Sequence, residues 1–187
     1  MTTRIETFIG GDEGPWRVSR IEAVAGPGLE SVSHVRVTGA PPGALPAGCG
    51  WQLRGCASHV RYSTRGELAD LARIQPSLGR SEATVAVLIP IGKSARWWDL
   101  AQDERRALFA ESSHHTATGR AFLPAIARKL LHARDLGEPF DFLTWFEFAP
   151  EHEGDFDRLL DRLRSTEEWR YVEREVEVRL RRAWPRG

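Results

Sequence analysis

The chain has few cysteines and no excess charge of either sign, and each of these features excludes a class of protein. Cys49 and Cys56 are the only cysteines in 187 residues, too few for a disulfide framework and without the CxxC spacing of a metal or redox motif. The 26 basic residues balance the 26 acidic ones, so no overall field attracts the chain to nucleic acid or to an anionic membrane. Any partner must therefore be recognised locally.

Long apolar runs and common functional motifs are also absent. No stretch has the length of a membrane-spanning helix, and the first residues lack the apolar core of a signal peptide. We therefore expect a cytoplasmic protein with no membrane or nucleic-acid partner, or a periplasmic one if a signal peptide has been removed. The GxGxxG, P-loop and GxSxG patterns do not occur, which argues against nucleotide-binding and hydrolase functions.

The composition is that of one ordinary folded domain. Hydrophobic residues make up 41% of the chain and charged residues 28%, values typical of globular proteins, and the length suffices to bury a sizeable core. We expect a single domain over residues 1–187. Its first 50 residues are irregular and strand-rich, and a more regular alternation of strands and helices occupies residues 51–183.

Hydrophobic periodicity predicts strands and helices in an alternating order. Strands are expected at residues 4–10, 15–26, 31–39, 51–63, 82–91, 123–136, 140–148 and 171–180, with a tight turn at 137–139 between the sixth and seventh. Helices are expected at residues 65–74, from about Asp99 to the histidine pair, and at 151–166, where Phe156, Leu159, Leu160 and Leu163 form one apolar face. This pattern predicts an α+β fold, a mainly antiparallel sheet with helices packed on its outer side.

Two adjacent histidines, His114 and His115, are the first candidates for chemistry. On a helix their side chains differ in direction by about 100°, so only one of them faces a given site. The HExxH arrangement of zinc enzymes is absent. A surface or core pair is one interpretation, and a single axial ligand to a metal or haem is the other.

Aromatic and charged residues supply further candidates, each with a structural alternative. Trp97, Trp98 and Trp145 are consistent either with core packing or with a flat apolar slot for a cofactor. Arg128, among apolar neighbours, is either the outward residue of a strand or an anion receptor in a dry pocket. The acidic pair in the segment TEEW is typical of a solvated helix end.

Four ordered segments together carry a family resemblance. WQLRGCASHVRY, ATVAVLIPIGKSARWWDL, ESSHHTATGRAFLPAIARKLLHARDLGEPFDFLTWFEFAPEH and LRSTEEWRYVEREVEVRL resemble the chlorite dismutase family in its short-chain, dimeric lineage. The resemblance covers about residues 51–180. It implies a dimeric α/β-barrel of two ferredoxin-like halves, a homodimer with one haem b per subunit, and conversion of chlorite to chloride and dioxygen.

The resemblance also implies roles for particular residues on one side of the haem. His115, the second histidine of the pair, would be the proximal iron ligand. Its outer ring nitrogen would bond a carboxylate from TEEW, with Glu168 preferred over the adjacent Glu167. Such a bond gives the imidazole anionic character, which stabilises oxidised iron.

The other implied roles concern the opposite side of the haem and its edge. Arg128 would be the distal arginine, with Gln75 beside it over the iron. Lys93, Trp97 and Trp98 match the family pattern KxxxWW, which lines the haem and contacts a propionate. A permanently charged guanidinium at this place can bind an entering anion and retain a leaving one.

Two other functions are consistent with the same segments. One is a related haem enzyme, a coprohaem decarboxylase or a peroxidase-like relative, although Arg128 and the short chain argue against the decarboxylase. The other is a non-catalytic dimeric barrel that binds haem.

Overall fold

A computed structural model of the chain describes residues 5–39, 47–57, 76–108, 122 and 125–183. The strands within these ranges are β1 (Ile5–Gly11), β2 (Trp16–Ala25), β3 (His34–Thr38), β4 (Cys49–Cys56), β5 (Val85–Lys93), β6 (Ala127–His132), β7 (Phe142–Phe148) and β8 (Val172–Arg182). The helices are α2 (Ala95–Asp99), α3 (Gln102–Arg106), α5 (Glu153–Arg164) and the short 3₁₀ turns η2 (Arg134–Leu136), η3 (Pro150–His152) and η4 (Glu167–Tyr171). None of the helices in the described ranges is long and apolar enough to cross a membrane.

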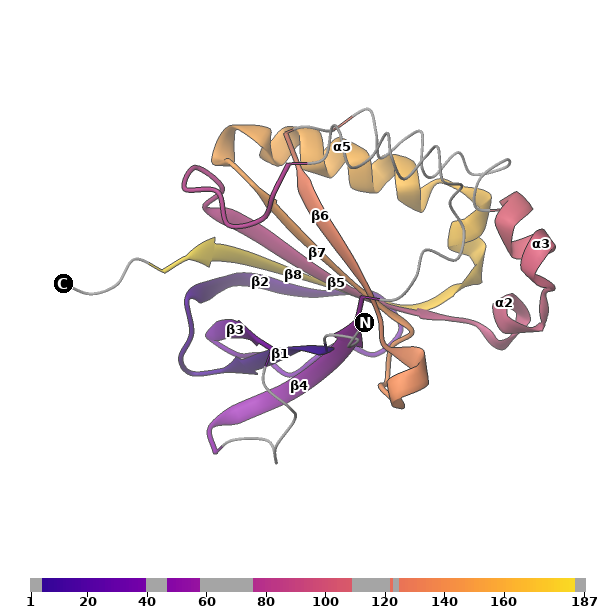
Figure 1. Ribbon diagram of the computed structural model, residues 1–187, viewed down its shortest axis with the longest axis horizontal. Coiled ribbons are helices and arrows are strands. Elements are labelled where there is room, and N and C mark those ends of the chain that lie inside the picture. Colours follow the sequence, from indigo (N-terminus) through magenta and orange to yellow (C-terminus); the bar gives the residue numbers. More distant parts are fainter. Residues whose placement is uncertain (1–4, 40–46, 58–75, 109–121, 123–124, 184–187) are drawn as a thin grey trace.

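The strands form one closed barrel (Figure 1). Their order around it is β1-β3-β2-β8-β5-β7-β6-β4, and β4 pairs back to β1. Every pairing among the described strands is antiparallel. The prediction of a mainly antiparallel sheet is confirmed, and the strand-rich segment before residue 40 supplies three of the barrel strands.

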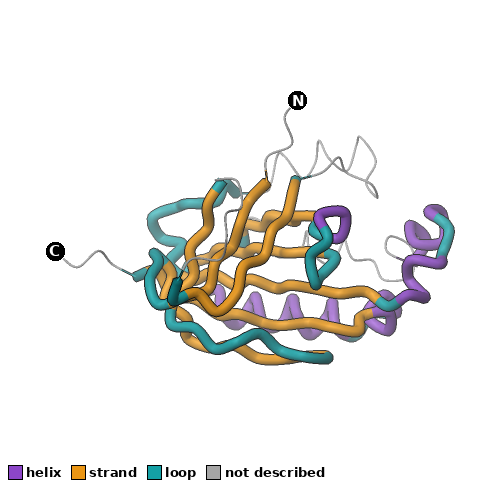
Figure 2. The backbone as a smooth tube through the Cα atoms, turned by 90° about the horizontal axis from the view of Figure 1, so that it is seen from below, coloured by secondary structure: helices purple, strands orange, loops and turns teal. Residues whose placement is uncertain are grey.

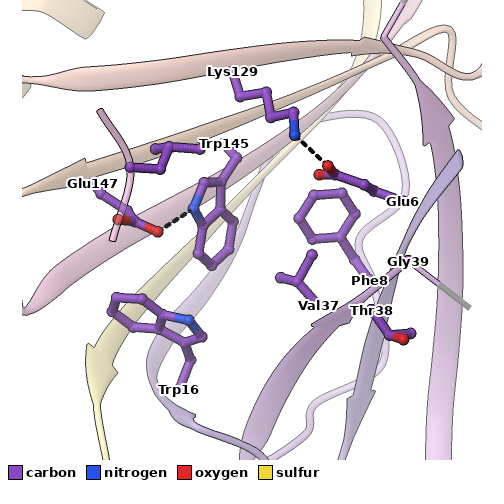
Figure 3. Close-up of a pocket in the computed structure, with 10 residues that line it drawn as sticks. Glu6, Phe8, Trp16, Val37, Thr38, Gly39, Lys129, Trp145 and Glu147 are labelled. Carbon is purple, nitrogen blue, oxygen red and sulfur yellow. Dashed lines mark hydrogen bonds and ion pairs between the residues drawn. The ribbon is translucent and has the colours of Figure 1, made fainter. Parts of the chain in front are cut away.

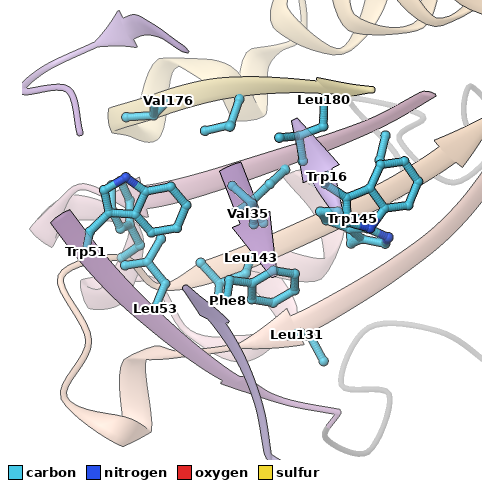
Figure 4. Packing of buried hydrophobic residues seen from close by; sticks show 14 of the residues in the cluster. Phe8, Trp16, Val35, Trp51, Leu53, Leu131, Leu143, Trp145, Val176 and Leu180 are labelled. Carbon is cyan, nitrogen blue, oxygen red and sulfur yellow. The ribbon is translucent and has the colours of Figure 1, made fainter. Parts of the chain in front are cut away.

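Strand β5 is an almost continuous apolar run because both of its faces are buried. Successive side chains of a strand point to opposite faces. Ala86 and Leu88 therefore point into the barrel, whereas Val85, Val87 and Ile89 pack in a second cluster outside it. Figure 4 shows the barrel interior, where Phe8, Val35 and Leu143 meet the tryptophans Trp16, Trp51 and Trp145, among other residues. Side chains on both faces of β5 are buried, as an apolar run of this kind predicts.

Helix α5 covers the outer cluster (Figure 2). Phe156, which is fully buried, lies with its ring centroid 5.1 Å from Phe146 and 4.8 Å from Phe148. Leu159 and Leu160 share the same buried face. Each such side chain contributes about 1.5–3 kcal/mol through burial. The predicted helix and its outer position are confirmed.

The long helix predicted from about Asp99 begins at Gln102, and the short helix before it, α2, was not predicted. α2 ends at Asp99, Ala101 is extended, and a second helix, α3, begins at Gln102. The Ala101 N–H donates to the Glu104 carboxylate at 2.6 Å, a bond that starts a new helix because it satisfies an otherwise unpaired donor. Residues 109–121, where the rest of the prediction falls, lie outside the described residues.

The connection between β6 and β7 also differs from its prediction. β6 ends at His132 and β7 begins at Phe142, so the link is longer than a tight turn and contains η2. Gly137 ends η2 with φ +72°, a left-handed conformation that glycine adopts without strain. The predicted strand at 51–63 corresponds to β4, which ends at Cys56. The helix predicted at 65–74 lies outside the described residues.

Candidate functional site

Lys93 and Glu168 form a buried ion pair at one end of β5. Lys93 is the last residue of the strand, and Glu168 comes from η4, which leads into β8. Lys93 Nζ donates to Glu168 Oε1 at 2.7 Å, with only 5% and 11% of the two side chains exposed. A buried pair of this kind is retained when each charge has its partner, because removing one leaves an unpaired charge out of water.

Trp97 lies directly against this pair. α2 begins two residues after β5 ends, and this tight connection brings the Trp97 ring beneath Lys93, with Nζ 4.6 Å from its centroid. The ring also meets the edge of Tyr171 at 5.5 Å. Trp97 is 2% exposed, and in the described part of the chain its indole Nε1 has no hydrogen-bond partner. A buried, unpaired donor next to an ammonium suits an anionic oxygen.

Trp98, the next residue, has different surroundings because adjacent helical residues point about 100° apart. Its ring stacks on Phe142 with a centroid distance of 6.0 Å, and the Arg134 guanidinium lies 4.1 Å from the ring centroid. Trp98 is half-buried rather than buried. Trp97 therefore faces the Lys93 pair, while Trp98 packs at the surface beside β7.

Asp141 connects the two sets of contacts, and sequence reasoning did not single it out. One of its oxygens accepts from the Lys93 backbone N–H at 2.6 Å and from Trp98 Nε1 at 3.3 Å. The other accepts from Arg134 at 3.0 Å. The signal in the sequence is an acidic residue between two phenylalanines at the start of an apolar strand. Asp141 holds the end of β5 and the start of α2 in their relative positions.

Arg128 lies farther along the sheet, on its outer face. It pairs in register with Phe146, whose side chain packs outside the barrel against α5. Phe142, which stacks on Trp98, lies four residues away on the same face of β7, about 13 Å along the strand. Arg128 is half-buried, and removal of water from around its guanidinium lowers its pKa. Arg128 is therefore not a fully solvated strand residue.

The remaining predicted site residues are placed as follows. Glu167 precedes Glu168 in η4 but is exposed, because successive residues of a 3₁₀ turn point in different directions. His114, His115 and Gln75 lie outside the described residues. The structure thus brings Lys93, Trp97 and Glu168 together, connects Trp98 to them through Asp141, and sets Arg128 on the same side of the sheet as Phe142.

Comparisons with known proteins show which family this sequence matches. The sequence model of the family described as chlorite dismutase matches residues 51–182. The chlorite dismutase of Ideonella dechloratans is 32% identical over 102 residues, which are 51% of this chain and 33% of that protein. The match thus spans about a third of the length of this curated relative.

Solved structures extend the similarity to nearly the whole chain. The dimeric chlorite dismutase of Nitrobacter winogradskyi is 54% identical, with a TM-score of 0.89 over 95% of this chain and 99% of that one. The chlorite dismutase of Candidatus Nitrospira defluvii in complex with imidazole shares the fold at 18% identity, with a TM-score of 0.66 over 96% and 92% of the two chains. Because the family match covers well over half of the sequence, the chain belongs to the chlorite dismutase family.

Proposed function

We propose that this chain is a haem b enzyme that converts chlorite to chloride and dioxygen, and that it acts as a homodimer. The observation that carries the proposal is the desolvated guanidinium of Arg128 on the same side of the sheet as the Lys93 cluster, in a chain 54% identical to a chlorite dismutase. The reaction is balanced, since ClO₂⁻ contains the atoms of Cl⁻ and O₂. The protein must therefore hold one small anion until both oxygens have joined.

The residues around Lys93 fit a haem. The propionates of a haem are anionic acceptors. The Trp97 indole N–H, which has no partner in the described part of the chain, and the Lys93 ammonium are two buried donors side by side that suit such an acceptor. We assign His115 as the iron ligand and Glu168 as the partner of its outer nitrogen. Glu168 is buried whereas Glu167 is exposed, which supports Glu168 over Glu167 for this role. The bound haem iron would supply the oxygen-transfer chemistry.

Arg128 binds the substrate in this proposal. Its planar, permanently charged guanidinium offers two parallel donors to an oxyanion, and low hydration strengthens the attraction. The same group would retain hypochlorite, which carries the second oxygen, so that this oxidant does not leave the site before both oxygens have joined. We assign Gln75 as its neighbour on that side. The negative charge on Glu168 orients the His115 ring and increases its basicity.

Oxygen evolution tests the activity directly. The haem-loaded protein, mixed with chlorite in a sealed oxygen electrode, should release one dioxygen per chlorite consumed and one chloride. A haem-loaded protein that bleaches without releasing oxygen contradicts the proposed reaction. It would favour a peroxidase-like relative or a non-catalytic haem-binding barrel.

The role of Arg128 is tested by Arg128→Ala, with Arg128→Lys as the matched variant that keeps the charge. Loss of a charge-assisted bond to a desolvated anion costs about 1.5–3 kcal/mol, equivalent to roughly a tenfold to hundredfold lower kcat/KM. The alanine variant should also release more hypochlorite, measured with a chlorination trap, and lose its haem colour after fewer turnovers. The lysine variant should lie between the two. Wild-type kinetics in Arg128→Ala would assign anion binding to another residue.

The iron ligand is tested by haem occupancy alone. His115→Ala should lose tightly bound haem, measured by the Soret absorbance per protein after gel filtration, while the neighbouring His114→Ala keeps it. Equal occupancy in the two variants contradicts the assignment, whatever the activity of either protein.

A further inference from the structure

The barrel contains a partly open cavity that the proposed reaction does not use. It has a volume of about 270 Å³ and lies at one end of the barrel interior, where its lining includes Glu6, Phe8, Trp16, Lys129, Trp145 and Glu147 (Figure 3). Lys129 follows Arg128 in β6, and neighbouring strand residues point to opposite faces. Arg128 is directed to the outer face of the sheet and Lys129 into the barrel. The cavity is therefore separate from the proposed haem side.

Glu147 gives the cavity a negative charge that no described cation neutralises by an ion pair. It is 6% exposed. One carboxylate oxygen accepts from Trp145 Nε1 at 2.9 Å and the other from the Gly79 backbone N–H at 2.6 Å, both neutral donors. The second carboxylate of the lining, Glu6, is paired with Lys129. A buried carboxylate with only neutral partners is stabilised further by a cation beside it.

Aromatic rings form much of the remaining wall. The Trp145 ring lies 5.6 Å from Phe8 and 5.5 Å from Trp16, between centroids. Arg182 already lies over Trp16, with its guanidinium carbon 5.0 Å from the ring centroid. Phe8 is fully buried and Trp145 is 4% exposed, so a ligand can meet only the part of the Trp145 ring that borders the cavity. Ring faces attract cations, most strongly for tryptophan and where water is excluded.

The cavity is partly open to the surface. Val37, which lines it from β3, is 37% exposed, a high value for a large apolar residue in this protein. The Lys129 side chain is 35% exposed. The cavity thus reaches the surface along the end of β3 and the middle of β6.

We propose that this cavity binds a small organic cation, a substituted ammonium whose charge lies beside Glu147 and whose alkyl groups contact Trp145 and Val37. The volume is slightly below the range of pockets that hold drug-sized ligands, so it suits a cation of few heavy atoms. Glu147 alone is a poor site for a bare metal ion, and no group of three or more metal-ligating side chains occurs within the described ranges.

The test compares two probes of the same shape that differ in charge. Choline and its neutral isostere 3,3-dimethylbutan-1-ol are titrated into the haem-loaded protein by isothermal calorimetry. Choline should bind at least about tenfold more tightly, the order expected for a charge-assisted contact. This arm needs no variant, so it does not depend on the folding of a mutant. Equal affinity of the two probes, or no heat with choline, overturns the proposal.

A variant then assigns the charge to Glu147. Glu147→Gln keeps the shape of the side chain and should weaken choline roughly tenfold while leaving the neutral isostere unchanged. Glu151→Gln, the same change at an exposed glutamate of η3, is the matched control and should bind choline as the wild type does. Unaltered choline binding in Glu147→Gln overturns the assignment. The Soret spectrum should not change when choline binds, because the cavity lies on the other face of the sheet.

Discussion

Glu177 should contribute a large, pH-dependent part of the stability of the barrel. It lies on β8, is 1% exposed, and accepts hydrogen bonds from three arginines. Arg164 of α5 donates at 2.6 Å, Arg179 at 2.5 Å and Arg20 of β2 at 2.8 Å. Burial alone would raise the pKa of Glu177, but these bonds outweigh it and lower the pKa from 4.5 to about 2. Glu177 thus ties α5 to two adjacent strands.

The size and sign of the effect follow from this pKa. The pKa of Glu177 falls from 4.5 in the unfolded chain to about 2 in the folded one, which corresponds to about 3 kcal/mol of stability at neutral pH. Because the folded-state pKa is the lower one, the unfolded chain takes up the proton first on acidification. The stabilisation is complete above pH 4.5 and is lost as the pH falls through about 2.

The perturbation is Glu177→Gln, which removes the charge and keeps the size. At about pH 7 we expect the free energy of unfolding to fall by about 3 kcal/mol. The difference from the wild type should shrink steadily as the pH is lowered between 4.5 and about 2. Urea unfolding followed by far-ultraviolet circular dichroism, at one protein concentration and one haem occupancy, measures both quantities.

Glu175 is the matched control because it lies two residues away and shares Arg164 as a partner at 2.7 Å. Burial raises the pKa of Glu175 despite that arginine, so folding disfavours its ionised form relative to the unfolded chain. Glu175→Gln should therefore cost much less than Glu177→Gln. Equal losses in the two variants, or a loss in Glu177→Gln that does not change with pH, would refute the reasoning.

Three further predictions concern the site, the core and the assembly. Asp141→Asn weakens the acceptor for the Lys93 backbone and the Trp98 indole, so haem should transfer faster to apomyoglobin; an unchanged transfer rate contradicts a positioning role. Gly10→Ala places a methyl group against the Trp51 ring inside the barrel, and urea unfolding should show a loss of about 1–3 kcal/mol through overpacking. Light scattering should give about 42 kDa, twice the 21.0 kDa of one chain, for a symmetric dimer. A mass near the 21.0 kDa of one chain contradicts the dimer. A mass near five times that of one chain indicates a different assembly.

Elements whose periodicity agrees with their packing were predictable from the sequence. The apolar face of Phe156, Leu159 and Leu160 predicts α5, and the continuous apolar run of residues 82–91 predicts a strand buried on both faces. The family resemblance implied Lys93 and Trp97 as neighbours, and the short connection from β5 to α2 brings them together.

Predictions failed where one local bond decided the outcome. The break between α2 and α3 depends on the bond between Ala101 and Glu104. A helical pattern of side chains on both sides of the break does not reveal it. In the strand predicted at 171–180, Glu175 and Glu177 on the polar face are each 1% exposed, which alternation of polar and apolar residues does not predict. Alternation shows which residues are polar, but the arginines that cover these two come from α5, β2 and β8 and are brought together only by the tertiary structure.

By itself, the sequence determined the fold class, the family and the residue types of the candidate site, because these depend on periodicity and on motifs within single segments. Only the tertiary structure decided which distant segments meet. It closed β1 against β4 to complete the barrel, brought Glu168 to Lys93 across 75 residues of chain, and placed Glu147 beside an interior cavity. Contacts between residues far apart in sequence depend on how whole strands pair and pack, and no single segment contains that information.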